Sequence, residues 1–104
     1  MSDPAQGDVW WVESEGDRRP VLVVTRSEAL AVLNAVVVAP LTRTVRGIPS
    51  ELPLGPDEGL PVACAASFDN LRRAAKSSLT VRIGRLGPER RHELRAALCA
   101  MSDC

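Results

Sequence analysis

Short apolar runs separated by turn-forming residues dominate the chain, a pattern that predicts strands joined by tight connections. We expect strands over residues 7–14, 20–25, 35–42, 48–54, 62–67 and 78–86. We expect turns or loops over residues 15–19, 43–47 and 55–61, and a short helical turn within 26–34. This spacing is typical of a small sheet that folds back on itself.

Individual strands carry further signals. Trp10 and Trp11 are consecutive in the first strand, so their side chains should point to opposite faces of the sheet. Pro20 fits only the first position of the second strand or an edge, and Pro40 should interrupt the third strand near its end. In the last strand, alternation predicts that Leu79, Val81 and Ile83 point inward. It predicts that Thr80 and Arg82 point outward.

The C-terminal stretch "GPERRHELRAALCAM" (87–101) predicts a helix. Gly87 and Pro88 suit its start, and Glu89 in the first turn complements the helix dipole. Its apolar residues repeat at helical spacing on one face: Leu94, Ala97, Leu98 and Met101. Short strands followed by one packing helix predict a mostly β fold, a small and strongly bent SH3-like antiparallel β-barrel with a C-terminal helix on its side.

Composition agrees with a single domain over residues 1–104. The chain is 45% hydrophobic and 25% charged, which provides enough apolar material for a core. No apolar run is long enough for a membrane helix, and the N-terminus lacks the pattern of a signal peptide, so we expect a soluble, cytoplasmic protein. A domain of this size has a modest stability margin, and pairing with a second copy would add to it.

The three cysteines are an odd number without CxxC spacing, and they suggest neither a disulfide framework nor a zinc site. We expect a buried thiol at Cys64, a thiol on the last helix at Cys99 and a third in the tail at Cys104.

Net charge is zero, but the charges are segregated along the chain. Residues 1–17 and 47–70 carry acids and no base, whereas residues 18–46 and 71–95 are rich in arginine. Such blocks can build a basic face on a neutral protein, as expected for a partner that carries phosphate groups. A solvated surface of mixed charges is an equal alternative.

The sequence excludes several catalytic constellations. The one histidine, His92, lies off the apolar stripe of the last helix and is expected to face solvent. No GxSxG, P-loop or GxGxxG motif occurs. Two acidic pairs do not resemble a two-metal cluster, namely Glu13 with Glu15 and Asp57 with Glu58, so we expect neither a metal nor a cofactor. The remaining arginines, threonines and serines are suited to holding phosphate oxygens.

Taken together, the segments "GDVWWV", "RRPVLVVT", "VVVAPLTRTVRG", "ELPL", "GLPVACAASFDNLR" and "SLTVRIGRL" resemble the MazF/PemK family of toxins. The similarity runs from about Gly7 to the final helix, and the block from Arg18 to Gly47 is its most specific part. The resemblance implies the compact barrel with a terminal helix that the family shares with CcdB-type gyrase poisons. It also implies a sequence-specific endoribonuclease of a type II toxin–antitoxin system, an RNA interferase that inhibits translation and growth.

The family pattern assigns roles to individual residues. The arginine directly before the proline of "RPVLV" is the family's catalytic arginine, here Arg19, and the threonine that ends "VVVAPLT" is its catalytic threonine, here Thr42. The resemblance also implies a set of RNA contacts: Arg18, Thr25, Arg26, Arg43, Arg46, Asp69, Asn70 and Arg72. The role of Arg18 relative to Arg19 stays open, and so does which tryptophan lines the RNA groove.

The implied reaction uses the 2′-OH of the RNA as its nucleophile and needs no metal, and it leaves a 2′,3′-cyclic phosphate and a 5′-OH end. The enzyme must align the reacting atoms and stabilise the added negative charge. Arg19 can donate two parallel hydrogen bonds to phosphate oxygens, and Thr42 can donate a third. Arginine is a poor general base because it holds its proton firmly, so we expect charge stabilisation to be its first role.

Partners follow from the same resemblance. The family acts as a homodimer with RNA in a groove across both subunits, and a cognate MazE-type antitoxin places its acidic, apolar C-terminal tail there. Only a short turn separates "WWVES" from "RRP", where typical members carry a longer glycine-rich loop, so this chain looks like the short-loop mycobacterial and other actinobacterial members. An open groove would admit tRNA or rRNA loops as well as mRNA.

Three alternatives stay open. A non-catalytic nucleic-acid-binding SH3-like barrel would keep the basic groove without needing Arg19 and Thr42 together. A gyrase-directed CcdB-like toxin would need a gyrase-binding C-terminal end, of which "LCAMSDC" gives no sign. A purely structural interaction domain would need none of these residues.

Overall fold

The computed structural model describes residues 3–30 and 32–102. Within them lie seven strands: β1 (Asp8–Ser14), β2 (Asp17–Val23), β3 (Ala35–Thr42), β4 (Glu51–Leu54), β5 (Cys64–Ser67), β6 (Arg72–Ala75) and β7 (Leu79–Arg85). The helical elements are α1 (Ser27–Leu30), α2 (Arg91–Ser102) and the 3-10 turns η1 (Pro56–Glu58), η2 (Phe68–Asn70), η3 (Lys76–Ser78) and η4 (Pro88–Arg90). None of these helices has the length and apolar character needed to cross a membrane.

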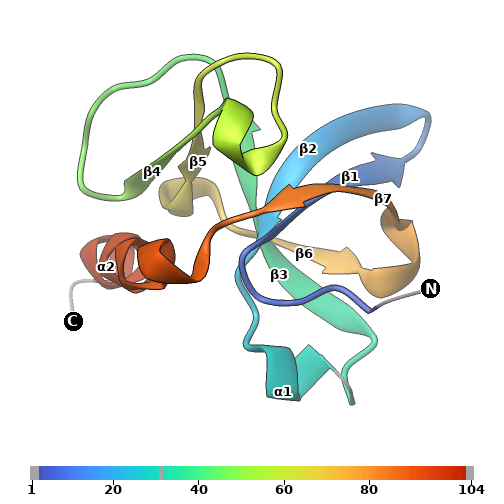
Figure 1. Cartoon of the computed structure of the whole chain (residues 1–104). Coiled ribbons are helices and arrows are strands. Elements are labelled where there is room, and N and C mark those ends of the chain that lie inside the picture. The colour runs from blue at the N-terminus through green and yellow to red at the C-terminus, as the bar shows by residue number, and fades with distance from the viewer. Residues whose placement is uncertain (1–2, 31, 103–104) are drawn as a thin grey trace.

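The strands form one antiparallel sheet in the order β4-β5-β3-β2-β1-β7, and β6 pairs with β3. β3 is the centre of the fold because it changes partner along its length. Residues 35–38 pair with β6 and residues 41–42 with β5, whereas β2 pairs with the other edge. A strand that switches partners in this way forms a corner of the sheet. Figure 1 shows β4 and β5 turned away from β1, β2 and β7 about this strand, so the predicted bent β fold with a C-terminal helix is confirmed as a curled half-barrel.

Both faces of β2 are buried over its last residues, 21–23, which explains the unbroken apolar run there. Val21 and Val23 belong to one hydrophobic cluster, whereas Leu22 and the following Val24 belong to another. The first cluster also contains Trp10, Leu30, Val36, Val38 and Leu79, and the second contains Val9, Leu52, Phe68 and Leu94 among others. Full burial of such a side chain contributes about 1.5–3 kcal/mol, so this strand is anchored from both sides.

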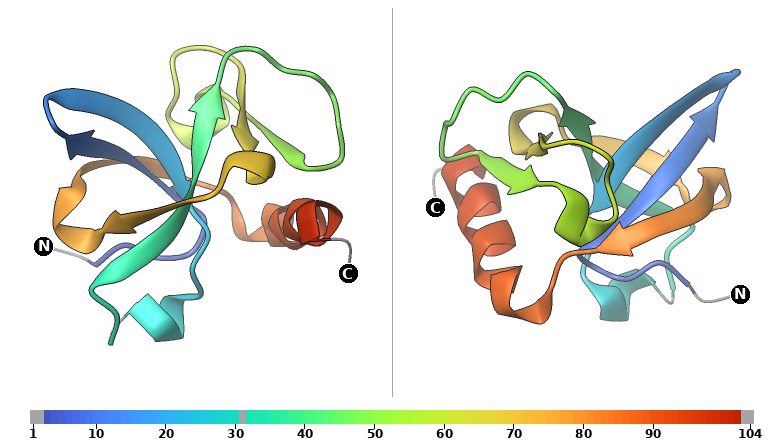
Figure 2. Two further views of the ribbon diagram at one scale, coloured as in Figure 1. Left: turned by 180° about the vertical axis from the view of Figure 1, so that it is seen from behind. Right: turned by 45° about the horizontal axis from the view of Figure 1, so that its top comes forward.

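α2 covers the second cluster. It packs against β4 and η2, and Figure 2 shows it lying beside that end of the sheet in both views. Leu94 and Ala97 are buried, and Leu98 and Met101 pack against the cluster, so the predicted apolar stripe is confirmed. The α-helix begins later than the sequence predicts, because η4 takes up the first residues of the expected helix. His92 is exposed, as expected.

The turn predicted over 15–19 is too long. Arg18 and Arg19 already lie within β2, and Pro20 stands inside that strand rather than at its first position. The strand tolerates this proline because its pairing with β3 begins only at Val21, which leaves that edge open beside Pro20.

Pro40 does not interrupt β3, and one strand escaped prediction. Pro40 pairs with Val21 on β2, and on its other side it lies between the residues that pair with β6 and those that pair with β5. The missed strand is β6, whose sequence RRAA has no apolar alternation to reveal it. Its backbone pairing with Ala35–Val38 of β3 holds it in the sheet.

The predicted alternation in β7 is wrong at Val81, which is 50% exposed. Leu79 pairs with Val12 but Val81 pairs with Trp11, so Thr80 is an extra residue in the register. Such a bulge reverses the parity of the strand. Leu79 and Val81 therefore fall on opposite faces although they are two residues apart.

The cysteines differ from expectation at one position. Cys64 is a free and buried thiol, as predicted. Cys99 takes part in a disulfide bond, so the expectation of a thiol there is wrong. Three cysteines without CxxC spacing still allow one disulfide bond, and no sequence pattern predicts it. The expectation for Cys104 concerns a position outside the described residues.

Candidate functional site

A hollow of about 490 Å³ lies beside β2 on the face to which Arg19 belongs. Arg72 and Arg73 of β6 line it together with Arg19, and we call it the arginine hollow. Arg19 forms an ion pair with Asp17, with 3.3 Å between Nη2 and Oδ2, and its side chain is 70% exposed. Such a pair is weak and exchanges readily for another anion. Glu15 and Asp17 also line the hollow, so its three guanidinium groups outnumber its two carboxylates.

A second hollow of about 480 Å³ lies on the opposite face of β2 and is lined by Trp11, Arg18 and Thr42; we call it the tryptophan hollow. The guanidinium carbon of Arg18 stands 4.5 Å from the centroid of the Trp11 ring, a cation–π stack. Nε of Arg18 also lies 3.5 Å from a carboxylate oxygen of Glu13. Most of the remaining wall is apolar: Pro20, Leu41, Leu60, Pro61, Val62 and Ile83.

The two tryptophans divide as the alternation of β1 predicts. Trp10 is buried in the core, where its indole N–H donates to Asp8 at 3.2 Å. Trp11 is half-buried and lines the tryptophan hollow. Because a strand points consecutive side chains to opposite faces, the same rule separates Arg18 from Arg19.

Thr42 ends β3 at the edge of the tryptophan hollow. Its hydroxyl oxygen accepts a hydrogen bond of 3.1 Å from the backbone N–H of Thr44. This contact fixes the position of the oxygen and leaves the hydroxyl proton available as a donor. Arg43 follows directly and lines the same hollow.

The structure does not bring Arg19 and Thr42 into one cavity. Arg19 lines the arginine hollow and Thr42 the tryptophan hollow. The border between the hollows falls between consecutive residues, because Arg19 and Pro20 line different hollows, and so do Pro40 and Leu41. The two residues nevertheless lie at neighbouring points of β2 and β3, because the register that pairs Leu22 with Ala39 and Val21 with Pro40 leads, two residues further along each strand, to Arg19 and Thr42.

Thr25 and Arg26 lie outside both hollows. The Thr25 hydroxyl accepts a hydrogen bond of 2.7 Å from the N–H of Val37, which ties the end of β2 to β3. The carbonyl oxygen of Arg26 accepts the 3.0 Å hydrogen bond from Ala29 that opens α1. These contacts give both positions a structural task.

Arg46, Asp69 and Asn70 also lie outside both hollows. The N–H of Arg46 donates to the buried carboxylate of Glu51 at 2.9 Å, which holds the loop before β4. The Asp69 carboxylate accepts from a serine hydroxyl of the same loop, and Asn70 donates to the hydroxyl of Ser67 at 2.8 Å. Of the predicted RNA contacts, Arg18 and Arg43 line the tryptophan hollow, and Arg72 lines the arginine hollow.

Arg73 and Cys64 are among the hollow-lining residues that the sequence did not predict as part of the site. Arg73 lines the arginine hollow beside Arg72. Because β6 was not predicted, the pair of consecutive arginines was the one sequence signal that could have pointed to Arg73. Cys64 lines the tryptophan hollow. Burial raises the pKa of the Cys64 thiol, the charge of Glu58 raises it further, and Arg43 partly opposes this. The thiol is thus kept protonated and is a poor nucleophile.

A family model described as the PemK-like, MazF-like toxin of type II toxin–antitoxin systems matches residues 5–102. The chain belongs to this family. The match includes both hollows and α2, so the resemblance seen in the sequence is confirmed over nearly the whole chain.

Individual MazF proteins are similar throughout. The probable endoribonuclease MazF2 of Mycobacterium tuberculosis is 41% identical over 100 residues, which cover 95% of this chain and 98% of the relative. The solved Mycobacterium tuberculosis toxin MazF-mt6 has a TM-score of 0.85 at 31% identity and covers 92% of this chain and 96% of its own. A mycobacterial endoribonuclease in complex with its cognate antitoxin gives a TM-score of 0.84 at 25% identity, with 96% and 95% covered.

Proposed function

We propose that this MazF-family chain is an endoribonuclease toxin that cleaves single-stranded regions of RNA at the border between the two hollows. The observation that carries the proposal is that border itself: a cationic hollow lies on one side and an oriented threonine hydroxyl on the other. The MazF2 and MazF5 relatives are named probable endoribonucleases, which supports the same reaction.

Arg19 and Thr42 act on the scissile phosphate. Arg19 exchanges the exposed carboxylate of Asp17 for two phosphate oxygens, to which its guanidinium donates in parallel. Thr42, whose oxygen is fixed by the N–H of Thr44, donates its hydroxyl proton to the same phosphate group. Both contacts strengthen as negative charge builds up on the non-bridging phosphate oxygens, which is how preorganised donors accelerate a reaction.

The reaction then needs no nucleophile from the protein. The 2′-oxygen of the RNA forms a bond to phosphorus and loses its proton, while the bond from phosphorus to the 5′-oxygen breaks and that oxygen gains a proton. The products are a 2′,3′-cyclic phosphate and a 5′-OH end. No metal is required, because the donors above supply the charge stabilisation.

The proposal includes the partners of the toxin. A cognate antitoxin of the MazE type would place carboxylates against the arginine hollow, in competition with phosphate groups. A homodimer in the cytoplasm, with RNA running across both subunits, is the assembly that we propose for the active form.

Mapping of RNA ends tests the activity. The wild type, Arg19→Ala and Thr42→Val are incubated with total cellular RNA in EDTA, and new 5′-OH ends are sequenced. Arg91→Ala serves as a matched arginine control, because Arg91 is exposed on α2 and lines neither hollow. We expect discrete cuts by the wild type and the control, and a rate lower by about 10²–10³ for the two site variants.

Each alternative has a distinct outcome in this experiment. Intact RNA in all samples, with RNA binding retained, would support a non-catalytic nucleic-acid-binding barrel instead. Inhibition of DNA supercoiling without RNA cleavage would support a gyrase-directed toxin.

A further inference from the structure

Arg18 and Arg19 are neighbours in sequence but face different surroundings. Arg19 lines the arginine hollow, where two more arginines lie and where charged or polar side chains share the wall with apolar ones. Arg18 lines the tryptophan hollow, where apolar side chains dominate. A phosphate group gains most among several cations, and it gains little beside an apolar wall. The two arginines are therefore suited to different parts of an RNA chain.

The guanidinium group of Arg18 is held by two contacts. It stacks at 4.5 Å on the Trp11 ring, and its Nε lies 3.5 Å from the Glu13 carboxylate. The first contact places the guanidinium carbon over the indole ring, and the ion pair engages Nε, so neither contact uses the two terminal Nη groups. A planar group oriented in this way offers donors along its edge and a flat surface on its other face.

Trp11 is the aromatic platform that the described residues offer to a ligand. The whole chain contains two tryptophans, one phenylalanine and no tyrosine. Trp10 is 8% exposed and Phe68 is fully buried, so both belong to the core. Proteins that bind unpaired bases stack them on aromatic rings or on arginine planes. In the described part of this chain, an accessible aromatic ring and an arginine plane occur together only at Trp11 and Arg18.

We propose that Arg18 and Trp11 together form a base-recognition site in the tryptophan hollow, so that Arg18 determines sequence specificity whereas Arg19 binds the scissile phosphate. The ligand class is one unpaired nucleobase next to the cut. The Nη groups of Arg18 donate to acceptors on the base edge, which favours guanine, with its neighbouring O6 and N7 acceptors, over adenine. This inference rests on the proposed ribonuclease activity.

Comparison of two conservative variants tests the inference. Arg18→Lys keeps the charge but removes the planar edge, and Arg19→Lys does the same at the proposed phosphate site. Cleavage sites are mapped across total RNA for both, for Trp11→Leu and for the surface control Arg91→Lys. We expect Arg18→Lys and Trp11→Leu to lose preference at one position of the motif by about tenfold. Arg19→Lys should cut the unchanged motif more slowly at all sites.

A binding measurement separates specificity from catalysis and from folding. An oligonucleotide carrying the mapped site, with a 2′-deoxy sugar at the cut, binds without being cleaved. The wild type should bind this oligonucleotide about tenfold more tightly than one in which the recognised base is replaced. Arg18→Lys should bind both with the same affinity. An unchanged motif and unchanged preference in Arg18→Lys would overturn the inference while leaving the ribonuclease intact. A wild type that cuts no RNA would overturn the proposed function and this inference with it.

Discussion

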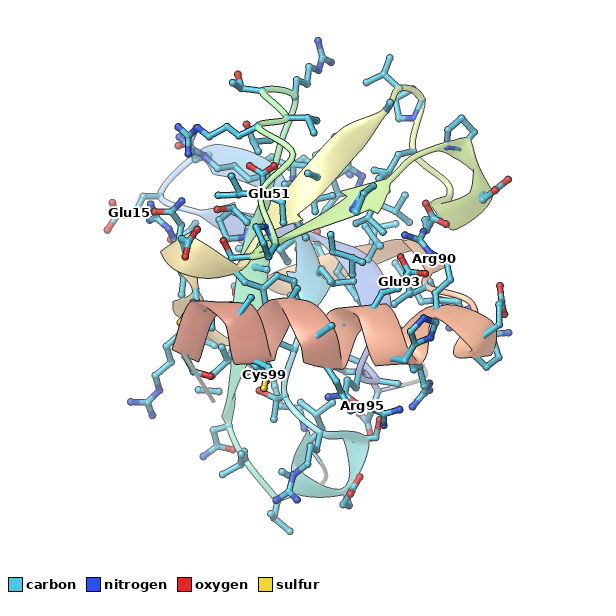
Figure 3. All side chains as sticks on the ribbon, turned by 90° about the vertical axis from the view of Figure 1, so that its left-hand side faces the viewer. Glu15, Glu51, Arg90, Glu93, Arg95 and Cys99 are labelled. Carbon is cyan, nitrogen blue, oxygen red and sulfur yellow. The ribbon has the colours of Figure 1, made fainter. Side chains whose placement is uncertain are left out.

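Arg90 donates a hydrogen bond to the buried carboxylate of Glu58, with 3.2 Å between Nη1 and Oε2. Glu58 is 5% exposed, and its other oxygen accepts from the N–H of Gly55 at 2.6 Å. The same guanidinium group donates to Glu93 at 2.9 Å and to the carbonyl oxygen of Pro53 at 2.8 Å. Figure 3 shows Arg90 and Glu93 together at the start of α2. One side chain thus ties the helix to η1 and β4.

Replacement of Arg90 should destabilise the protein strongly. Arg90→Met leaves the Glu58 carboxylate buried without its cation, and removal of one partner from a buried pair costs about 3 kcal/mol. Urea denaturation monitored by circular dichroism measures the difference. Arg95→Met is the control, because the Arg95 side chain points away from α2 on the side opposite to Arg90 in Figure 3. This substitution should change the free energy of unfolding by less than about 0.5 kcal/mol. Equal losses in the two variants would contradict the role given to the Glu58 contact.

The contact between Arg90 and Glu93 predicts a pH dependence. The hydrogen bond from Arg90 lowers the pKa of Glu93 below its ordinary value. A carboxylate with a lowered pKa contributes stability above its unfolded pKa, and this contribution disappears as the pH falls through the folded pKa. Glu93→Gln should therefore have a lower Tm than the wild type near pH 7, and this gap should shrink as the pH falls below about 4 and on through the lowered pKa of folded Glu93.

Solvent limits the size of this effect. The Glu93 side chain is 36% exposed, so screening reduces the contribution of the ion pair. Thermal melts of both proteins at the two pH values, repeated at high salt, give the measurement. A Tm gap of the same size at both pH values would show that the charge of Glu93 is not its source.

A close backbone approach makes Gly84 irreplaceable. A Cβ atom at Gly84 would lie 2.0 Å from the carbonyl oxygen of Glu58, so β7 and η1 would have to separate. Gly84→Ala should cost at least about 3 kcal/mol, measured by chemical denaturation. Gly16→Ala is the matched control. Gly16 has a positive φ of 82°, but a Cβ atom added there would contact no other part of the chain within 4 Å, so conformational strain alone predicts a loss of about 1–2 kcal/mol. A Gly84→Ala protein no less stable than Gly16→Ala would argue against the close approach.

The sequence predicted the fold where apolar residues report burial. The run from Val21 to Val24 and the stripe containing Leu94 and Ala97 both mark buried surfaces, and the structure buries them. It failed where backbone pairing alone holds an element. β6 carries two arginines and two alanines and is held by its ladder with β3, and the bulge at Thr80 depends on how β7 meets β1. Neither feature leaves an apolar pattern to read.

The candidate site shows the same division. The motif around Arg19 and Thr42 was visible in the sequence, but the placement of Arg18 was not. The predicted strand began at Pro20, so Arg18 and Arg19 were assigned to a turn, where side-chain direction has no fixed rule. Once both residues belong to β2, alternation puts them on opposite faces and separates the two hollows.

Arg72 predicts a measurable salt effect on RNA binding. It lines the arginine hollow and is exposed, so its proposed partner is a backbone phosphate. Each phosphate contact to single-stranded nucleic acid adds about 0.7 to the slope of log affinity against log salt concentration. Arg72→Gln should therefore flatten this slope by about 0.7, with binding weakened similarly for different base sequences. Titration of a 2′-deoxy-substituted oligonucleotide at several salt concentrations provides the slope, and Arg91→Gln should leave it unchanged. If Arg72→Gln shows the same salt dependence as the wild type, the RNA phosphates do not bind in the arginine hollow.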